Sequence, residues 1–164
     1  MNETTLQLAS DLGQALKEKG WRLTCAESCT GGGIGYAITS VSGSSGWFER
    51  GFITYSDEAK QELLGVEKSM LIVEGAVSAT VAEQMATGAL KAAGADLAIA
   101  VSGIAGPDGG SPEKPVGTVW FGFATRDKAI SKHQRFVGDR LQIRSQSIEF
   151  ALQQALELLN TSAG

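Results

Sequence analysis

Apolar positions three to four residues apart predict three long amphipathic helices in this chain. The first covers Thr4–Lys19 and ends at a glycine, which favours the left-handed conformation that stops a helix. The second begins at Ser78 or Thr80, with a glutamate three residues after Thr80 that fits a capping box, and ends near Gly94. The third covers Arg140–Asn160, near the end of the chain.

Apolar runs between these helices predict five strands. They are expected at Trp21–Ala26, Phe48–Tyr55, Asp96–Ser102, Thr118–Ala124 and Ala129–Val137. The run Asp96–Ser102 is almost continuously apolar, which is typical of a strand buried on both faces. The last two strands turn around Arg126-Asp127 and form a hairpin.

Two shorter helices complete the pattern. One covers Gly32–Val41, after the polar turn Glu27–Gly35, and the other begins at the N-cap Ser56 and continues through Leu64. Helices that alternate with strands favour an α/β fold. We therefore expect residues 1–164 to form a single three-layer domain, with helices flanking a mixed sheet that is partly parallel.

Composition narrows the functional classes. The chain has 43% hydrophobic and 20% charged residues, a net charge of -4, two cysteines and one histidine. An acidic balance argues against nonspecific nucleic-acid binding, which needs a basic face. With no long apolar run and no signal peptide, we expect a cytoplasmic protein without a membrane partner. We expect no metal site and no cofactor, because the histidine and the cysteines Cys25 and Cys29 lack a zinc-ligand spacing.

Three loops carry candidate chemistry. The first, Ala26–Gly32, follows a strand and opens a helix, so its N–H groups and helix dipole could face an anion. The second, Tyr55–Lys60, places a lysine in the first turn of a helix, where cations are disfavoured by roughly 0.3–1 kcal/mol. The third, Ser102–Gly110, follows the most buried strand, at the edge where α/β sheets bind ligands.

Each loop also has a plain structural interpretation. The first could be a capped helix start, the third a rigid loop, and Lys60 a surface lysine paired with Asp57. His133 falls in a predicted strand and is expected to be a sheet or surface residue. Trp47, Phe48 and Trp120 could belong to the core or to an interface, of which the core is favoured. Self-association into a homo-oligomer is left open.

Five stretches of the chain together resemble the CinA C-terminal domain family. They are AESCTGG (26–32), GSSGWFERGFITYSDEAK (43–60), GAVS (75–78), SGIAGPDGGSPEKPVGTVWF (102–121) and GDR (138–140). Stand-alone members of that family are nicotinamide-nucleotide amidohydrolases. The resemblance implies hydrolysis of nicotinamide mononucleotide to nicotinate mononucleotide and ammonia, in pyridine-nucleotide salvage. Larger members carry an additional N-terminal domain, which we do not expect in a chain that begins with these motifs.

The resemblance assigns the family's serine and lysine to Ser28 and Lys60, with Tyr55 nearby to orient the lysine or relay a proton. Free lysine has a pKa of about 10.4, so roughly one side chain in a thousand is neutral at pH 7. Lowering that pKa by about 3 takes about 4 kcal/mol, more than an exposed helix dipole supplies. We therefore expect Lys60 to be buried. Cys29 is the rival nucleophile, and Ser28 is preferred chiefly on the family pattern.

The remaining candidates would bind the substrate. The oxyanion would be held by N–H groups around Ser28–Thr30 or by the loop Gly103–Gly106. The candidate substrate-binding residues are Thr30, Gly31, Gly103, Ile104, Ala105, Gly106, Arg140 and Arg144. Either arginine could bind the phosphate. Two other functions stay open: a noncatalytic nucleotide-binding module, and a DNA-associated competence or damage protein.

Overall fold

Five strands form one mixed sheet in the computed structural model, which describes residues 1–161. The strands are β1 (Leu23–Glu27), β2 (Phe52–Ile53), β3 (Leu97–Gly103), β4 (Thr118–Ala124) and β5 (Ala129–Arg135). Their order in the sheet is β2-β1-β3-β4-β5. β1 pairs in parallel with both β2 and β3, while β4 and β5 extend the sheet as an antiparallel hairpin.

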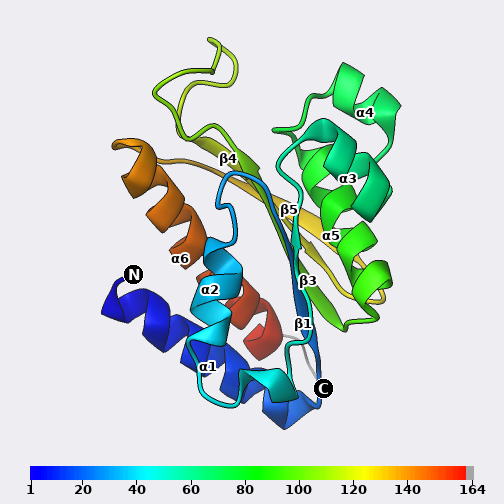
Figure 1. Ribbon diagram of the computed structural model, residues 1–164, viewed down its shortest axis with the longest axis vertical. Helices are drawn as coiled ribbons and strands as arrows, with labels where there is room; N and C mark the ends of the chain where they lie inside the picture. Colours follow the sequence, from blue (N-terminus) through cyan, green and yellow to red (C-terminus); the bar gives the residue numbers. More distant parts are fainter. Residues whose placement is uncertain (162–164) are drawn as a thin grey trace.

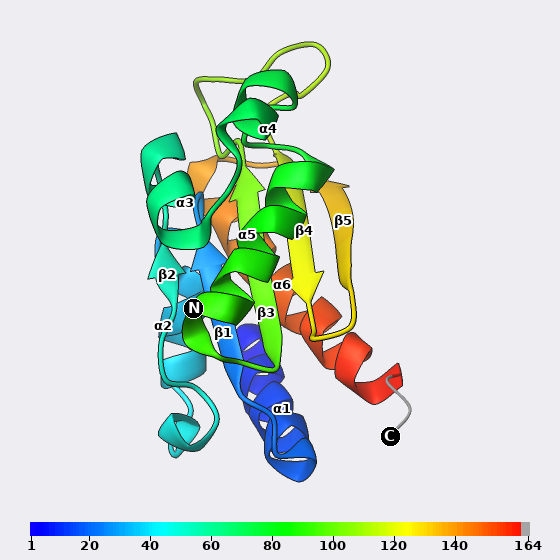
Figure 2. The ribbon, with the colours of Figure 1, turned by 90° about the vertical axis from the view of Figure 1, so that its right-hand side faces the viewer.

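Helices cover both faces of the sheet, which confirms the expected three-layer α/β architecture (Figure 1). One face carries α1 (Glu3–Lys19), α2 (Gly33–Thr39) and α6 (Arg140–Thr161), and the other carries α3 (Asp57–Leu64), α4 (Lys68–Val73) and α5 (Ala79–Ala93). Figure 2 looks onto the second face, where α5 crosses the central strands. β3 is buried on both sides up to Ser102, as its apolar run predicted.

Local chemistry fixes where the helices begin and end. Asn2 caps α1 by accepting from Thr5 N at 2.8 Å, so the helix begins at Glu3, one residue earlier than the apolar pattern indicated. Ser78, not Thr80, caps α5, because its hydroxyl accepts from Val81 N at 3.3 Å. The capping box predicted at Thr80 is therefore wrong, and Thr80 lies inside the helix.

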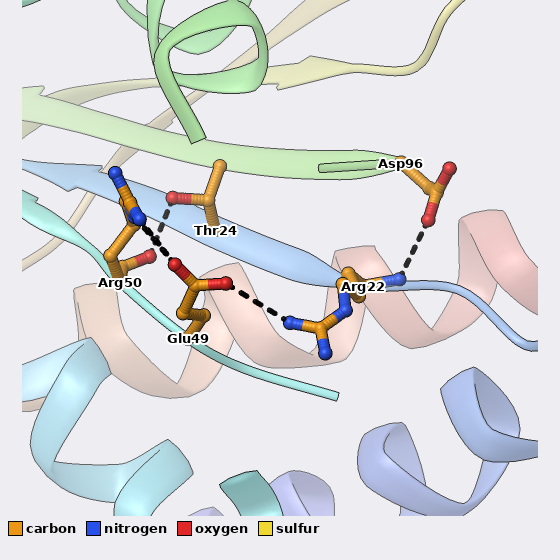
Figure 3. A network of polar contacts seen from close by, with 5 residues as sticks. All are labelled: Arg22, Thr24, Glu49, Arg50 and Asp96. Carbon is orange, nitrogen blue, oxygen red and sulfur yellow. Dashed lines mark hydrogen bonds and ion pairs between the residues drawn. The ribbon is translucent and has the colours of Figure 1, made fainter. Parts of the chain in front are cut away.

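The strand predicted at Phe48–Tyr55 is mostly irregular. Only Phe52 and Ile53 pair as a strand, and Phe48 makes an isolated bridge to Leu23. Between them the chain bends around Cys25, because Gly51 lies so close that a Cβ would approach its sulfur to 2.8 Å. Polar contacts hold this edge instead, as Figure 3 shows: Thr24 donates to the Arg50 carbonyl at 2.8 Å. Arg22 donates to Glu49 through its side chain and to Asp96, just before β3, through its backbone N–H.

Helix α4 was not predicted. Its apolar residues, Met70 to Val73, are consecutive and give no helical period, and no side chain caps its start. Only Leu71 is buried, so the helix lies on the surface. No helix within residues 1–161 combines the length and apolar character needed to cross a membrane.

The parallel half of the sheet determines where chemistry can occur. β2, β1 and β3 are neighbours that point the same way, so their carboxyl ends meet at one edge. The three loops singled out in the sequence follow these three strands. Segments far apart in the chain are therefore brought together at that edge.

Candidate active site

A cavity of about 330 Å³ opens at the carboxyl edge of the parallel strands. The loop after β1 contributes Ser28 and Cys29, and the segment after β2 contributes Tyr55, Asp57 and Lys60. The remaining lining residues are Ala76 and Val77 before α5, Ser102 to Gly106 and Asp108 after β3, and Arg140 at the start of α6. All three predicted catalytic residues therefore line one cavity.

Ser28 and Lys60 are in direct contact inside this cavity. Lys60 Nζ donates to Ser28 Oγ at 3.0 Å, and Ser28 is only 7% exposed. The backbone positions both groups, because Ser28 N donates to the Val101 carbonyl at 3.0 Å and Ser56 caps the helix that carries Lys60. A hydroxyl and an amine at this distance have the geometry of a nucleophile and its base.

Lys60 is buried, as its proposed role requires. Its side chain is 1% exposed, and Nζ also donates to the carbonyls of Thr54 at 2.9 Å and Tyr55 at 3.4 Å. Burial lowers the pKa of Lys60 below its ordinary value, and the negative charge of Asp57 opposes that change. The interpretation of Lys60 as a surface lysine is therefore wrong. No ion pair between Lys60 and Asp57 forms in the described chain.

Cys29 lines the same cavity, but burial keeps its thiol protonated. Burial raises the pKa of the Cys29 thiol to about 11, so the thiol is protonated near neutral pH. The thiolate is the nucleophilic form of cysteine. The geometry pairs Lys60 with the hydroxyl of Ser28, while no side chain in residues 1–161 accepts the proton of Cys29.

Glu27 is a buried acidic residue that the sequence analysis missed. Its carboxylate accepts hydrogen bonds from Thr30 Oγ1 at 2.6 Å and Ile34 N at 2.8 Å. The N–H groups at the start of α2 thus face Glu27, which corrects the expectation that they face a ligand. The only sequence signal was an acidic residue just before a glycine-rich helix start.

Three of the predicted substrate-binding residues lie outside the cavity lining: Thr30, Gly31 and Arg144, which is described below. The hydroxyl of Thr30 is buried against Glu27, and Gly31 is exposed beside Arg144. Gly31 adopts a φ of 55°, and a Cβ there would come within 3.3 Å of Arg144 Nη2. Thr30 and Gly31 both shape the turn that carries Ser28, so their placement indicates a structural contribution.

Arg140 and Tyr55 meet across the mouth of the cavity. Arg140 Nη2 donates to the Tyr55 hydroxyl at 3.2 Å, and Nη1 donates to the Gly106 carbonyl at 2.7 Å. Tyr55 contacts Lys60 through its backbone carbonyl, and its hydroxyl is directed to Arg140. This arrangement favours an orienting contribution from Tyr55 over a proton relay.

Arg144 has a different environment from Arg140. Its guanidinium donates to the carbonyls of Cys29 at 3.1 Å and Thr30 at 3.3 Å, and it does not line the cavity. One turn of α6 thus separates an arginine in the cavity from one that holds the loop of Ser28. Of the two candidates for phosphate binding, the placement favours Arg140.

The loop after β3 forms another wall of the cavity, with Gly103, Ile104, Ala105 and Gly106 all in the lining. Gly106 adopts a φ of 77°, in which its carbonyl accepts from Arg140. Asp57 and Asp108, which sequence reasoning did not single out as ligand residues, add acidic groups to the lining. The cavity therefore carries both signs of charge.

A larger cavity, of about 570 Å³, lies at the opposite edge of the sheet beside Trp21, Asp96 and Lys128. Among the described residues it is lined by no serine, cysteine or histidine. His133 lies in β5 and stacks on Trp120 at a ring distance of 4.8 Å. Trp47 is buried in the core, whereas Phe48 and Trp120 are only partly buried. The smaller cavity is thus the candidate active site.

Known proteins resemble this chain over nearly its whole length. The chain is 60% identical over 158 residues to nicotinamide-nucleotide amidohydrolase PncC of Enterobacter agglomerans. This match covers 95% of this chain and 96% of that protein. It is 57% identical over 149 residues to PncC of Escherichia coli K12, with 90% of each chain covered. A crystal structure of a competence-damaged protein (CinA) superfamily protein from Klebsiella pneumoniae matches with a TM-score of 0.93 at 41% identity, covering 98% of this chain and 99% of that one. The family model for the CinA C-terminal domain matches residues 5–159. The chain therefore belongs to the CinA C-terminal domain family.

Proposed function

We propose that this protein is a nicotinamide-nucleotide amidohydrolase that converts nicotinamide mononucleotide and water to nicotinate mononucleotide and ammonia. The observation that carries the mechanism is the 3.0 Å contact between Lys60 Nζ and Ser28 Oγ inside a cavity. The names of relatives at 60% and 57% identity support the substrate. Both cysteines are free thiols, which suits action in the reducing cytoplasm.

The surroundings of Lys60 suit both of its protonation states. A neutral amine has two N–H groups and one lone pair. The carbonyls of Thr54 and Tyr55 accept the two N–H groups, which leaves the lone pair to receive the proton of Ser28. When protonated, the ammonium has three donors for the same three partners. Lys60 therefore takes and returns a proton without rearranging its neighbours.

The reaction then proceeds in two halves. Ser28 Oγ attacks the carboxamide carbon while its proton moves to Lys60, and a tetrahedral oxyanion forms. The oxyanion collapses, the C–N bond breaks, and Lys60 protonates the departing ammonia to leave an ester on Ser28. Water attacks the ester, Lys60 takes the water's proton, and its return to Ser28 Oγ releases the carboxylic acid product.

Backbone donors near Ser28 would stabilise the oxyanion. Within residues 1–161, the N–H groups of Thr30, Ala105 and Gly106 have no backbone or side-chain acceptor, whereas the N–H of Cys29 faces its own sulfur. These groups lie on the loops after β1 and β3, of which Cys29, Ala105 and Gly106 line the cavity. Removing one such donor from an enzyme typically costs about 10²–10³ in kcat.

Arg140 would bind the 5′-phosphate at the mouth of the cavity. It is the one arginine among the described lining residues, and its guanidinium is already directed inward by Gly106 and Tyr55. Arginine suits this purpose because its fork of donors matches phosphate oxygens. Arg144 would contribute indirectly, through the carbonyls of the loop that carries Ser28.

The test is release of ammonia from nicotinamide mononucleotide by the purified protein, measured in parallel with Ser28→Ala. We expect turnover by the wild type and none by the variant, which should still bind the nucleotide by calorimetry. Binding without turnover in the wild type would instead support a noncatalytic binding module. Full activity of Ser28→Ala would remove Ser28 from the mechanism.

A further inference from the structure

Glu27 is a buried anion without a cationic partner. It is 1% exposed, and no lysine, arginine or histidine within residues 1–161 forms an ion pair with it. Burying a carboxylate costs several kcal/mol unless hydrogen bonds replace its water. Donors around the Glu27 carboxylate must therefore take the place of that water.

Five hydrogen bonds replace the water around this carboxylate, one of them a long 3.8 Å bond that the Cys25 thiol donates to Oε2. Oε1 accepts from Thr30 Oγ1 at 2.6 Å, Ile34 N at 2.8 Å and Gly32 N at 3.2 Å, and Oε2 accepts from Gly35 N at 3.0 Å. Three of these donors are backbone N–H groups at the start of α2, where the helix dipole favours a negative charge. The carboxylate thereby joins the end of β1 to the first turn of α2.

Ser28 lies in the short loop that these hydrogen bonds enclose. Glu27 precedes it, and the donors from Thr30 to Gly35 follow it. On the other side of the loop, the guanidinium of Arg144 donates hydrogen bonds to the carbonyls of Cys29 and Thr30. An anion thus holds the N–H side of the loop and a cation holds its carbonyl side.

We propose that Glu27 is a positioning residue, which keeps Ser28 Oγ in reach of Lys60 and directs the N–H groups of α2 away from the substrate. The inference rests on the proposed function, because it assumes that Ser28 is the nucleophile. It goes further by assigning the start of α2 to Glu27, which leaves the phosphate to the cavity mouth at Arg140. Glu27 itself does not line the cavity and acts only through the loop.

The test compares Glu27→Gln with Thr24→Val. The glutamine keeps the shape of the side chain but places an amide N–H₂ against backbone N–H donors. Some of the hydrogen bonds that Glu27 accepts from the loop are therefore lost. Thr24 is also buried on the same strand, but its hydroxyl donates to the carbonyl of Arg50, in the segment before β2 (Figure 3). Thr24→Val therefore removes one buried hydrogen bond of β1 without touching the loop.

We expect Glu27→Gln to lower kcat for ammonia release at least about tenfold, since misplacing a reacting group by 1 Å can cost about 10². KM should change less than about threefold, because phosphate binding is elsewhere. Thr24→Val should keep kcat within about twofold of the wild type, whatever both variants lose in melting temperature. Wild-type kcat in Glu27→Gln, or an equal loss in Thr24→Val, would overturn the proposal.

A second pair of variants covers the case in which Glu27→Gln does not fold. Thr30→Val removes only the 2.6 Å bond to Glu27, and Thr30→Ser retains a hydroxyl. We expect the serine variant to turn over at least about five times faster than the valine variant, at matched melting temperatures. Equal rates in the two variants would refute the proposal that Glu27 positions Ser28. An inactive wild type would instead refute the proposed function.

Discussion

Lys60 reaches Ser28 across 32 residues of sequence and donates a hydrogen bond of 3.0 Å to its hydroxyl. The contact depends on the neighbouring parallel strands β1 and β2, whose ends place the two side chains on the same edge of the sheet. Thr54 N continues the pairing with a 2.8 Å bond to the Glu27 carbonyl. The register between these strands therefore determines the geometry of the nucleophile and its base.

Ser28 and Cys29 are adjacent, and their variants should behave differently. We expect Cys29→Ala to keep most of the ammonia release, because the wild-type thiol, with a pKa of about 11, is protonated near neutral pH. Iodoacetamide should likewise alkylate Cys29 slowly at neutral pH, as measured by mass spectrometry. If Cys29→Ala were inactive and Ser28→Ala active, the nucleophile would be the thiol.

The pH dependence of activity should follow the neutral fraction of Lys60. The charge of Asp57 favours the ammonium and keeps the pKa of Lys60 higher than burial alone would. We therefore expect Asp57→Asn to move the acid limb of kcat/KM to lower pH. Glu58→Gln changes a neighbouring exposed acid outside the cavity lining and is the matched control. A shift to higher pH in Asp57→Asn would contradict this assignment of the limb.

Lys60 should also make stability depend on pH. Its folded-state pKa is lowered, so at pH values between the folded and unfolded pKa the unfolded chain binds the extra proton. The penalty of the buried charge is greatest at low pH and is relieved as pH rises. As the pH rises toward the free-lysine pKa of about 10.4, the wild type should gain unfolding free energy relative to Lys60→Met. Urea unfolding of both proteins at several pH values measures this difference. A fall in the wild type's relative unfolding free energy with rising pH would contradict a lowered pKa of Lys60.

Arg140→Ala should weaken nucleotide binding more than it slows chemistry. Loss of a charged hydrogen bond to phosphate costs about 1.5–3 kcal/mol, so KM for nicotinamide mononucleotide should rise about 10–100-fold. The kcat/KM for nicotinamide riboside, which has no phosphate, should change far less. Arg135→Ala replaces an exposed arginine of β5 outside the lining and should match the wild type. Equal losses on both substrates would assign Arg140 to holding Gly106 and Tyr55.

Gly88 allows α3, the helix of Lys60, to pack against α5. A Cβ at position 88 would lie 1.8 Å from the Leu64 carbonyl oxygen, which is fixed backbone. We expect Gly88→Ala to lower the unfolding free energy by at least about 1–3 kcal/mol and to reduce kcat, because α3 must move. Gly46→Ala introduces the same methyl group where nothing lies within 4 Å and should be nearly neutral. Calorimetric unfolding of both variants checks the difference.

The sequence allowed most of the architecture to be predicted because its elements are locally encoded. The apolar run of β3 and the caps Ser56 and Ser78 specify their elements with few outside contacts. The edge segment before β2 could not be predicted, since its path depends on the close approach of Gly51 to Cys25. Helix α4 carries no periodic pattern and was missed for that reason.

For the candidate site, motifs indicated the residues but not their partners. The burial of Lys60 followed from the chemistry a base requires and is confirmed. The separate surroundings of Arg140 and Arg144 could not be inferred, because adjacent turns of one helix differ only in what packs against them. Glu27 was missed because a glutamate at the end of a strand ordinarily faces water.

The start of α6 contributes Arg140, which lines the cavity, and Arg144, which holds the Ser28 loop although more than a hundred residues separate it from Cys29 and Thr30. Synthesis on the ribosome produces the serine and its lysine long before these arginines. The nascent chain thus contains both residues early, while Arg144 does not yet hold the carbonyls of the Ser28 loop. Catalytic competence should consequently appear only once the final helix has been made and has docked.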